Sequence, residues 1–299
     1  MSLRPPWLSF RRYAAATTSM TLVLVGLGIY TAATGSGLAC EAQWPLCSDQ
    51  LIPKLTINPD FLEWFHRVWA MITGFLMLGL AGWAWLGDRS RRVRFAATLA
   101  VVVLPLQITV GAITVTIGGM IQGGYSAPTH AAHLIVALVI FTLLSLTTLY
   151  AALDGDGRRR TASDATALLG RSFAVAAGLL LVAATMNRAV PFVTYSPGAQ
   201  AWFYGVALAA HFALLAAVVV GLETDRHRPA AVGGLGLSAL FVTMLLGRDL
   251  VLYTAAWETV NRITLAVAVL AAAGGFWIVT RGEDGDGDDD VAATTVRGD

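Results

Sequence analysis

The sequence predicts an all-α membrane protein with eight transmembrane helices, arranged as two tandem four-helix bundles related by a pseudo-two-fold axis along the membrane normal. The first reason is composition: the 299 residues are 56% apolar and 13% charged, whereas soluble domains hold roughly 25% charged residues. The second is a set of apolar stretches of about 20 residues, the length that crosses a bilayer core. The third is a weak internal repeat. The predicted spans are 13–34, 62–86, 95–118, 127–152, 172–191, 201–222, 232–252 and 257–280.

The first span, 13–34, is too long for the apolar core of a signal peptide, so we expect it to stay in the protein as a helix. Arginine clusters then orient all the spans, because loops rich in Lys and Arg stay in the cytoplasm. Arginines precede the first span and follow the second, fourth and sixth. We therefore expect a multi-pass plasma-membrane protein with both termini cytoplasmic. The orienting residues are Arg4, Arg11, Arg12, Arg89, Arg91, Arg92, Arg94, Arg158, Arg159, Arg160, Arg171, Arg226 and Arg228.

The chain divides at a long arginine-rich connection, which we expect to be a cytoplasmic linker over 153–171. It separates a catalytic half, 1–152, from a second half, 172–281. The last residues, 282–299, are acidic and predict a disordered tail. A net charge of +1 excludes the overall basic field that nucleic-acid binding needs, so the expected surroundings are membrane lipid.

A weak repeat supports this division into two halves of four spans. Residues 106–111 (LQITVG) in the third span parallel 242–247 (VTMLLG) in the seventh. Residues 64–68 (WFHRV) in the second span parallel 202–206 (WFYGV) in the sixth. Because each half crosses the membrane an even number of times, the two repeats have the same orientation.

Histidines inside apolar spans are the first candidates for chemistry, because a polar ring within a bilayer is costly unless it has a partner. His66 lies about one turn into the second span from the outer side, and His133 lies about two turns into the fourth. Two imidazoles at similar depth can bind the iron of a haem from opposite faces. We therefore expect His66 and His133 to be the ligands of a haem iron, with hydrogen bonding between helices as the alternative.

Two more intramembrane histidines leave alternatives open. His130 lies three residues before His133 and on roughly the same helical face, so either ring could be the ligand. His133 is preferred, because its depth matches that of His66. His211, in the sixth span, is a weaker candidate for haem binding and a stronger one for a hydrogen bond between helices.

Glu63 lies one turn before His66 on the same helical face, so its carboxylate would approach whatever the histidine binds. Such a group could transfer protons or stabilise a cationic intermediate. The alternative is a carboxylate near a helix N-terminus, favoured there by the helix dipole. Arg67 could pair with Glu63, bind a haem propionate or extend to the outer surface.

Cys40 and Cys47 are the only cysteines, and both lie in the first outer loop. On the oxidising side of a membrane, two cysteines this close are expected to form a disulfide or to cycle as a dithiol. A purely structural cross-link is the alternative to a redox role.

Three motifs around these residues strongly resemble the first-loop and second-helix signature of the haem A synthase family. They are 34–40 (TGSGLAC), 43–47 (QWPLC) and 63–67 (EWFHR). The resemblance is strong over 13–152 and only architectural over 172–280.

The resemblance implies an enzyme that oxidises the methyl group at ring position 8 of haem O to a formyl group, giving haem A for terminal oxidases. It implies that His66 and His133 hold the substrate haem, that Glu63 is the essential acid, and that Cys40 and Cys47 are the family's outer-loop cysteines. It also implies haem O synthase and terminal oxidase assembly as partners, and an electron donor that the sequence does not identify.

Bacterial members of that family usually bind a second haem, of b type, through two histidines in the second half, and this sequence departs from the pattern. The repeat places Tyr204 where His66 stands and Asn261 where His133 stands. His211, two turns deeper than Tyr204, could be a displaced single ligand but cannot complete a pair. We therefore expect the second half to be a degenerate scaffold.

Two other classes compete with this interpretation. A cytochrome b-like electron-transfer protein would need the same histidines but neither Glu63 nor the cysteines. A membrane thiol-disulfide oxidoreductase would be built on Cys40 and Cys47, but that class normally carries a second cysteine pair or a quinone site, and the sequence has no further cysteine.

Overall fold

The computed structural model describes residues 8–41, 43–122, 124, 126–154, 161–188, 196–246 and 254–295, with side chains described up to residue 281. Within these residues, eight helices are long and apolar enough to cross a membrane, which confirms the predicted all-α membrane fold. A short 3₁₀ helix, η1 (Ser36–Leu38), follows the first of them. The long helices are α1 (Phe10–Ala33), α2 (Pro59–Leu86), α3 (Arg91–Met120), α4 (Ala127–Asp154), α5 (Ala162–Met186), α6 (Pro197–Glu223), α7 (His227–Leu246) and α8 (Ala255–Thr295).

The helix starts follow from capping residues in the sequence. The side chain of Asn58 accepts a hydrogen bond from the backbone N–H of Phe61, and a proline occupies the first position of α2. Thr161 and Asp164 form a capping box at the start of α5. This box starts α5 well before residue 172, so the connection between α4 and α5 is shorter than the predicted linker 153–171.

The C-terminal part of the chain meets the predictions only in part. α7 ends at Leu246, and the rest of the predicted span 232–252 lies outside the described residues. The backbone of α8 continues to Thr295, but no side chain after Arg281 is described. The acidic tail over 282–299 therefore stays a prediction.

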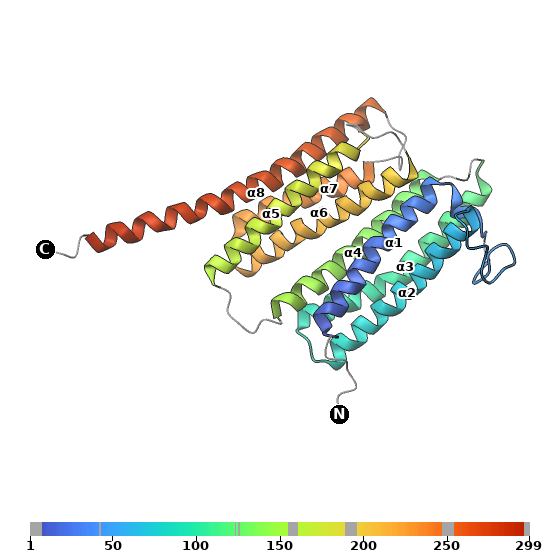
Figure 1. Cartoon of the computed structure of the whole chain (residues 1–299), viewed down its shortest axis with the longest axis horizontal. Coiled ribbons are helices and arrows are strands. Elements are labelled where there is room, and N and C mark those ends of the chain that lie inside the picture. Colours follow the sequence, from blue (N-terminus) through green and yellow to red (C-terminus); the bar gives the residue numbers. More distant parts are fainter. Residues whose placement is uncertain are drawn as a thin grey trace.

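Each half is a ring of four helices in which every helix contacts the one before and the one after it. In the first half the contacts run from α1 to α2, α3 and α4 and back to α1, and in the second from α5 to α6, α7 and α8 and back to α5. The two rings lie side by side, with α6 of the second against α1 and α4 of the first (Figure 1). The repeated ring is compatible with the predicted pseudo-two-fold.

The two ends of the bundle differ. The loop between α1 and α2, which carries both cysteines, lies at one end, and the start of α1 and the end of α4 lie at the other (Figure 1). Since the helices alternate in direction, the arginine clusters before α3 and α7 share the end opposite the cysteine loop. This is the alternation on which the predicted orientation depends.

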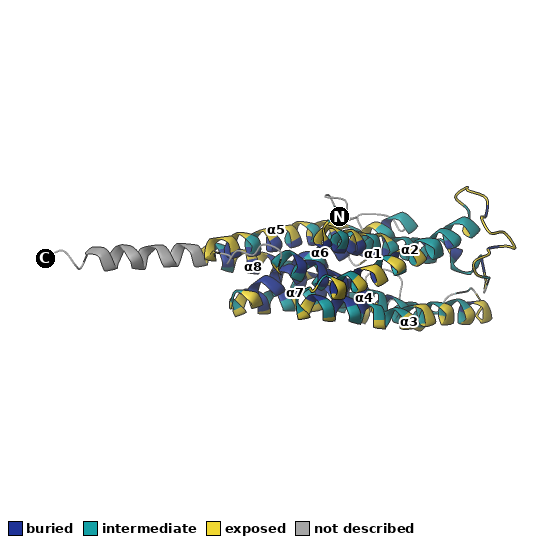
Figure 2. Cartoon of the chain, turned by 90° about the horizontal axis from the view of Figure 1, so that it is seen from below, coloured by how far each residue is buried: buried dark blue, intermediate teal, exposed yellow. Residues whose placement is uncertain are grey.

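Burial is concentrated in the second half. In α6, 67% of the most apolar window is buried, whereas in α3 the share is 6% (Figure 2). The larger core cluster includes Phe173, Phe203, Tyr204 and Leu214, each fully buried. α3 lies at the edge of the molecule, where its apolar side chains suit contact with lipid.

Candidate haem site of the first half

His66 points from α2 towards α1. A Cβ atom placed on Gly28 of α1 would lie 2.9 Å from the Cε1 atom of His66, so the absence of a side chain at Gly28 lets the ring lie against the α1 backbone. The Nδ1 atom of His66 is buried and has no hydrogen-bond partner among the described residues.

His133 is placed in the same way by α3. A Cβ atom on Gly111 would lie 2.9 Å from the Cε1 atom of His133. One turn away on α3, the side-chain nitrogen of Gln107 lies 3.2 Å from the Nε2 atom of His133. The Nδ1 atom of His133, like that of His66, is buried without a partner among the described residues.

The two rings therefore occupy equivalent positions. His66 and His133 come from α2 and α4, which lie across the first ring of helices, and Gly28 and Gly111 come from α1 and α3, which complete it. Each ring keeps one buried nitrogen without a partner among the described residues, at a cost of about 1–3 kcal/mol, and Nδ1 of His211 on α6 is unpaired in the same way. His133 also contacts α3 through Gln107, so a hydrogen bond between helices is part of its surroundings. The residues present fit a haem iron between the two rings.

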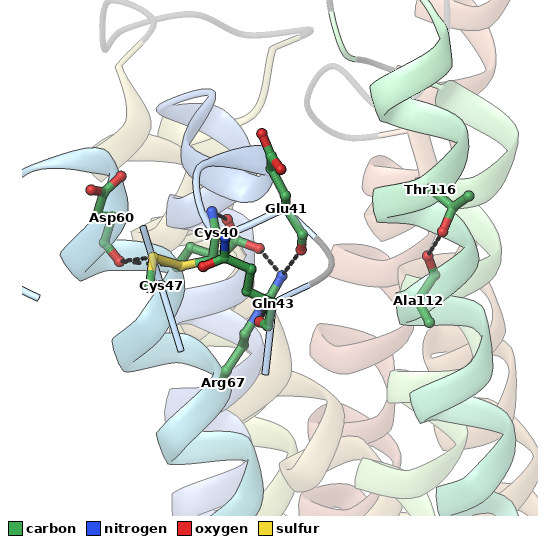
Figure 3. Close-up of polar contacts among 9 residues, drawn as sticks. Cys40, Glu41, Gln43, Cys47, Asp60, Arg67, Ala112 and Thr116 are labelled. Carbon is green, nitrogen blue, oxygen red and sulfur yellow. Dashed lines mark hydrogen bonds and ion pairs between the residues drawn. A yellow bond between two sulfur atoms is a disulfide. The ribbon is translucent and has the colours of Figure 1, made fainter. Parts of the chain in front are cut away.

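Glu63 and Arg67 hold the outer loop to the first turns of α2. The carboxylate of Glu63 is buried, accepts a hydrogen bond of 2.6 Å from the backbone N–H of Cys40, and pairs with the guanidinium of Arg67. Arg67 also donates to the carbonyl oxygens of Gln43 and Glu41, at 2.6 and 2.7 Å (Figure 3). The predicted pairing of Arg67 with Glu63 is therefore present in the structure.

Cys40 and Cys47 form a disulfide, as expected. Both residues are buried, and their sulfur atoms lie 3.6 and 3.5 Å from the carbonyl oxygen of Asp60 in the first turn of α2 (Figure 3). The backbone of Cys47 also pairs with that of Gln50. The disulfide thus closes the loop directly above the helix that carries His66.

The other two intramembrane histidines lie in different surroundings. The Nδ1 atom of His130 lies 2.8 Å from the carbonyl oxygen of Ser126, within the first turn of its own helix. His211 is buried on α6, and its Nε2 atom lies 2.9 Å from the hydroxyl of Thr142 on α4. His211 therefore joins the two halves, as its hydrogen-bonding alternative predicted.

The positions in the second half that correspond to the histidine pair are closed by protein groups. The hydroxyl of Tyr204, on α6, donates to the carbonyl oxygen of Met244 on α7 at 2.7 Å. The amide of Asn261, on α8, exchanges hydrogen bonds of 2.9 and 3.3 Å with Asn187, which follows α5. Tyr204 and Asn261 are fully buried.

Sequence reasoning did not single out three residues of the site: Gln107, Gly28 and Gly111. Both Gln107 and Gly111 belong to the repeat 106–111, and a small residue such as Gly111 suits close packing of helices. A signal was present, because Gln107 is an uncharged polar residue inside an apolar span, where such side chains usually have a partner. Gly28 carries no comparable signal, since small residues are common in packed membrane helices.

Comparison with known proteins gives a match to one family model and to several named relatives. The COX15-CtaA family model, described as cytochrome oxidase assembly protein, matches residues 11–282. The chain is 36% identical to haem A synthase of Bacillus licheniformis over 148 residues, which are 49% of this chain and 46% of that protein. It is 34% identical to haem A synthase of Geobacillus kaustophilus over 159 residues, 51% of this chain and 50% of that protein. The chain thus spans about half the length of these relatives.

A relative with a different name matches a similar length of this chain. The protohaem IX farnesyltransferase of Halobacterium salinarum is 37% identical over 131 residues, which are 44% of this chain and 27% of that protein. The family match covers far more, from the start of α1 to the end of the last described side chains. From this coverage, the chain belongs to the COX15-CtaA family of cytochrome oxidase assembly proteins.

Proposed function

We propose that the protein is a haem A synthase, which oxidises the methyl group at ring position 8 of haem O to a formyl group. The observation that carries this proposal is the pair of buried imidazoles, His66 and His133, each lying against a glycine of the neighbouring helix. The haem A synthases that share about a third of their aligned residues with this chain support the same activity.

In the proposed site the porphyrin iron would supply the oxidising chemistry, and the chain would supply binding and orientation. His66 and His133 would hold the substrate haem. Glu63 and Arg67 would fix the outer loop above it, because together they contact Cys40, Glu41 and Gln43. A carboxylate one turn from His66 would also be the nearest acid to the porphyrin edge on that helix face, suited to proton transfer.

We propose further that the second half binds no second haem through a pair of histidines and serves as a scaffold. Tyr204 and Asn261 replace the histidines there, and both are hydrogen-bonded to neighbouring segments. His211, the remaining candidate, is engaged with Thr142. The scaffold would fix α1 and α4 by packing α6 against them.

The partner that we propose is a haem O-forming enzyme in the same membrane. The farnesyltransferase named above carries a region similar to this chain within a longer protein, so the two activities are compatible with close association. The charge pattern favours the plasma membrane with cytoplasmic termini. Terminal oxidase assembly would receive the product.

The test is expression of the full chain in a host that makes haem O but no haem A, followed by extraction and identification of the haems. We expect haem A only when the chain is present. The control is Glu63→Gln, which keeps the size of the side chain and should retain the haem spectrum while haem O accumulates. A wild-type chain that binds haem and leaves haem O unchanged would identify the cytochrome b-like alternative and contradict the proposed activity.

A further inference from the structure

Gln107 is the one side chain that contacts a ring nitrogen of the histidine pair from another helix among the described residues. Its side-chain nitrogen lies 3.2 Å from Nε2 of His133. We propose that Gln107 is a positioning residue that makes His133 the exchangeable ligand of the haem, while His66 remains bound. This inference rests on the proposed haem site.

The geometry places the amide in competition with a metal for one lone pair. An amide nitrogen only donates hydrogen bonds, so the Nε2 atom of His133 accepts from Gln107. The lone pair that accepts this bond is the one with which Nε2 would bind iron. Binding of His133 to iron and to Gln107 are therefore mutually exclusive.

The hydrogen bond from Gln107 to His133 would be broken easily. The other polar atom of its amide, Oε1, is buried and has no hydrogen-bond partner among the described residues. The amide is thus only half satisfied, and a buried unpaired acceptor is costly. The bond to His133 would hold the ring whenever the ring is not bound to a haem, and Gly111, one turn along α3, has no side chain where the ring lies.

His66 has no equivalent partner. Its ring lies against Gly28 of α1, and its Nδ1 atom has no hydrogen-bond partner among the described residues. If His66 left the iron, it would gain no hydrogen bond from the described residues around it. His133, by contrast, would return to Gln107. The contacts of the two histidines are therefore asymmetric, so a haem held between them would be released more easily by His133 than by His66.

The second half shows that this position on the third helix of each ring faces the fourth helix. Thr243 occupies the place of Gln107 in the repeat, and its hydroxyl donates to that of Thr264 on α8 at 3.0 Å. In the first half, the longer side chain of Gln107 makes the corresponding contact from α3 to His133 on α4. A hydrogen bond from the third helix to the fourth is thus present at this position in both halves. Among the described residues, its partner is a histidine nitrogen only in the first half.

Cyanide binding to the purified full-length protein loaded with ferric protohaem tests the inference, because cyanide needs an open coordination position. In Gln107→Leu the open form loses its hydrogen bond, so we expect the apparent cyanide affinity to fall about fivefold, the ratio that one hydrogen bond supports. The high-spin fraction in the ferric absorption spectrum should fall with it. Gln107→Asn, which keeps an amide but is too short to reach His133, should behave in the same way.

The matched control is Thr116→Val on the same helix, because Thr116 is exposed and donates at 2.9 Å only to Ala112 of its own helix in the contacts described (Figure 3). It should bind cyanide like the wild type. The effect of Gln107→Leu should vanish in His133→Ala, where no ring competes with cyanide, and also in His66→Ala, where the position opposite His133 is already open to cyanide. An equal effect in His133→Ala would mean that Gln107 acts on cyanide directly and would overturn the inference.

The outcomes separate this inference from the proposed function. A normal two-histidine haem spectrum with unchanged cyanide affinity in both Gln107 variants would overturn the inference and leave the haem site standing. A wild-type protein without any haem spectrum would overturn both. If cyanide affinity falls in the Gln107 variants but the wild-type protein makes no haem A, the inference stands and only the proposed reaction is contradicted.

Discussion

α2 and α4 in the first half and α6 and α8 in the second occupy the same places in their rings, yet their central polar residues have opposite surroundings. His66 and His133 lie against glycines and keep buried nitrogen atoms without partners among the described residues. Tyr204 and Asn261 reach neighbouring segments and are bonded to Met244 and Asn187. The first four-helix ring thus keeps polar atoms that could bind a ligand. In the second four-helix ring the corresponding side chains are hydrogen-bonded to neighbouring segments.

The two four-helix rings differ at these positions in the type of side chain and in its neighbours. A long or branched polar side chain that finds a backbone carbonyl or an amide contributes to packing and hydrogen bonding between helices. The imidazoles of His66 and His133 each lie against a glycine and keep Nδ1 without a partner among the described residues, while Nε2 of His133 contacts Gln107. Burial follows the same division, since α6 is the most buried span and α3 the least.

The largest expected effect separates the two halves by haem content. Replacing both His66 and His133 by Ala should abolish the Soret absorption of protein supplied with protohaem, because no ligand would remain for the iron. His211→Ala, which removes a ring that bonds Thr142, should lower stability but leave the spectrum intact. Absorption spectra of the purified variants measure both. Haem retained without His66 and His133 would remove the basis of the comparison.

The second prediction concerns the glycines that face the rings. Gly28→Ala or Gly111→Ala would place a methyl group 2.9 Å from an imidazole carbon, and such overpacking costs about 1–3 kcal/mol. We expect haem affinity to fall about ten- to hundredfold, measured by haem titration.

Gly205→Ala in the second half is the matched control, because an added Cβ there meets nothing within 4 Å. It should bind haem normally. Equal losses at Gly205 and Gly111 would show that the effect reflects helix packing in general.

A smaller effect is expected from the buried amide pair of the second half. Asn261→Ala would leave groups of Asn187 without the partner they have now, at a cost of about 1–3 kcal/mol. Thermal unfolding in detergent should show the loss, while the haem spectrum of the first half stays unchanged. Loss of haem in this variant would mean that the halves are not separable in function.

The smallest effect is expected from Tyr204→Phe. It removes the hydrogen bond to the carbonyl of Met244 but keeps the ring in the core, so the expected loss is about 1 kcal/mol. The melting temperature should fall by a few degrees, with haem content constant. Haem binding altered by this single hydroxyl would place Tyr204 in the haem site instead of the scaffold.

Much of the fold could be predicted because hydropathy and capping act locally. The spans, the disulfide of Cys40 and Cys47, and the place of His66 one turn below the outer loop all follow from short stretches of sequence. α5 begins at Ala162, before the apolar span predicted over 172–191, because its first turns are polar and hydropathy does not register the Thr161 capping box. The start of a helix with polar first turns is indicated by its capping residues instead.

The sequence by itself determined that eight stretches are long and apolar enough to cross a membrane, that His66 and His133 lie within two of them, and that the repeat places Tyr204 and Asn261 at the matching positions of the second half. These properties depend on residue type and spacing along one helix. Only the tertiary structure decided which side chains meet: that Gly28 and Gly111 face the two rings, that Gln107 reaches His133, and that Arg67 ties Glu63 to the loop. Contacts between helices depend on their rotation and separation, which periodicity within a single helix does not specify.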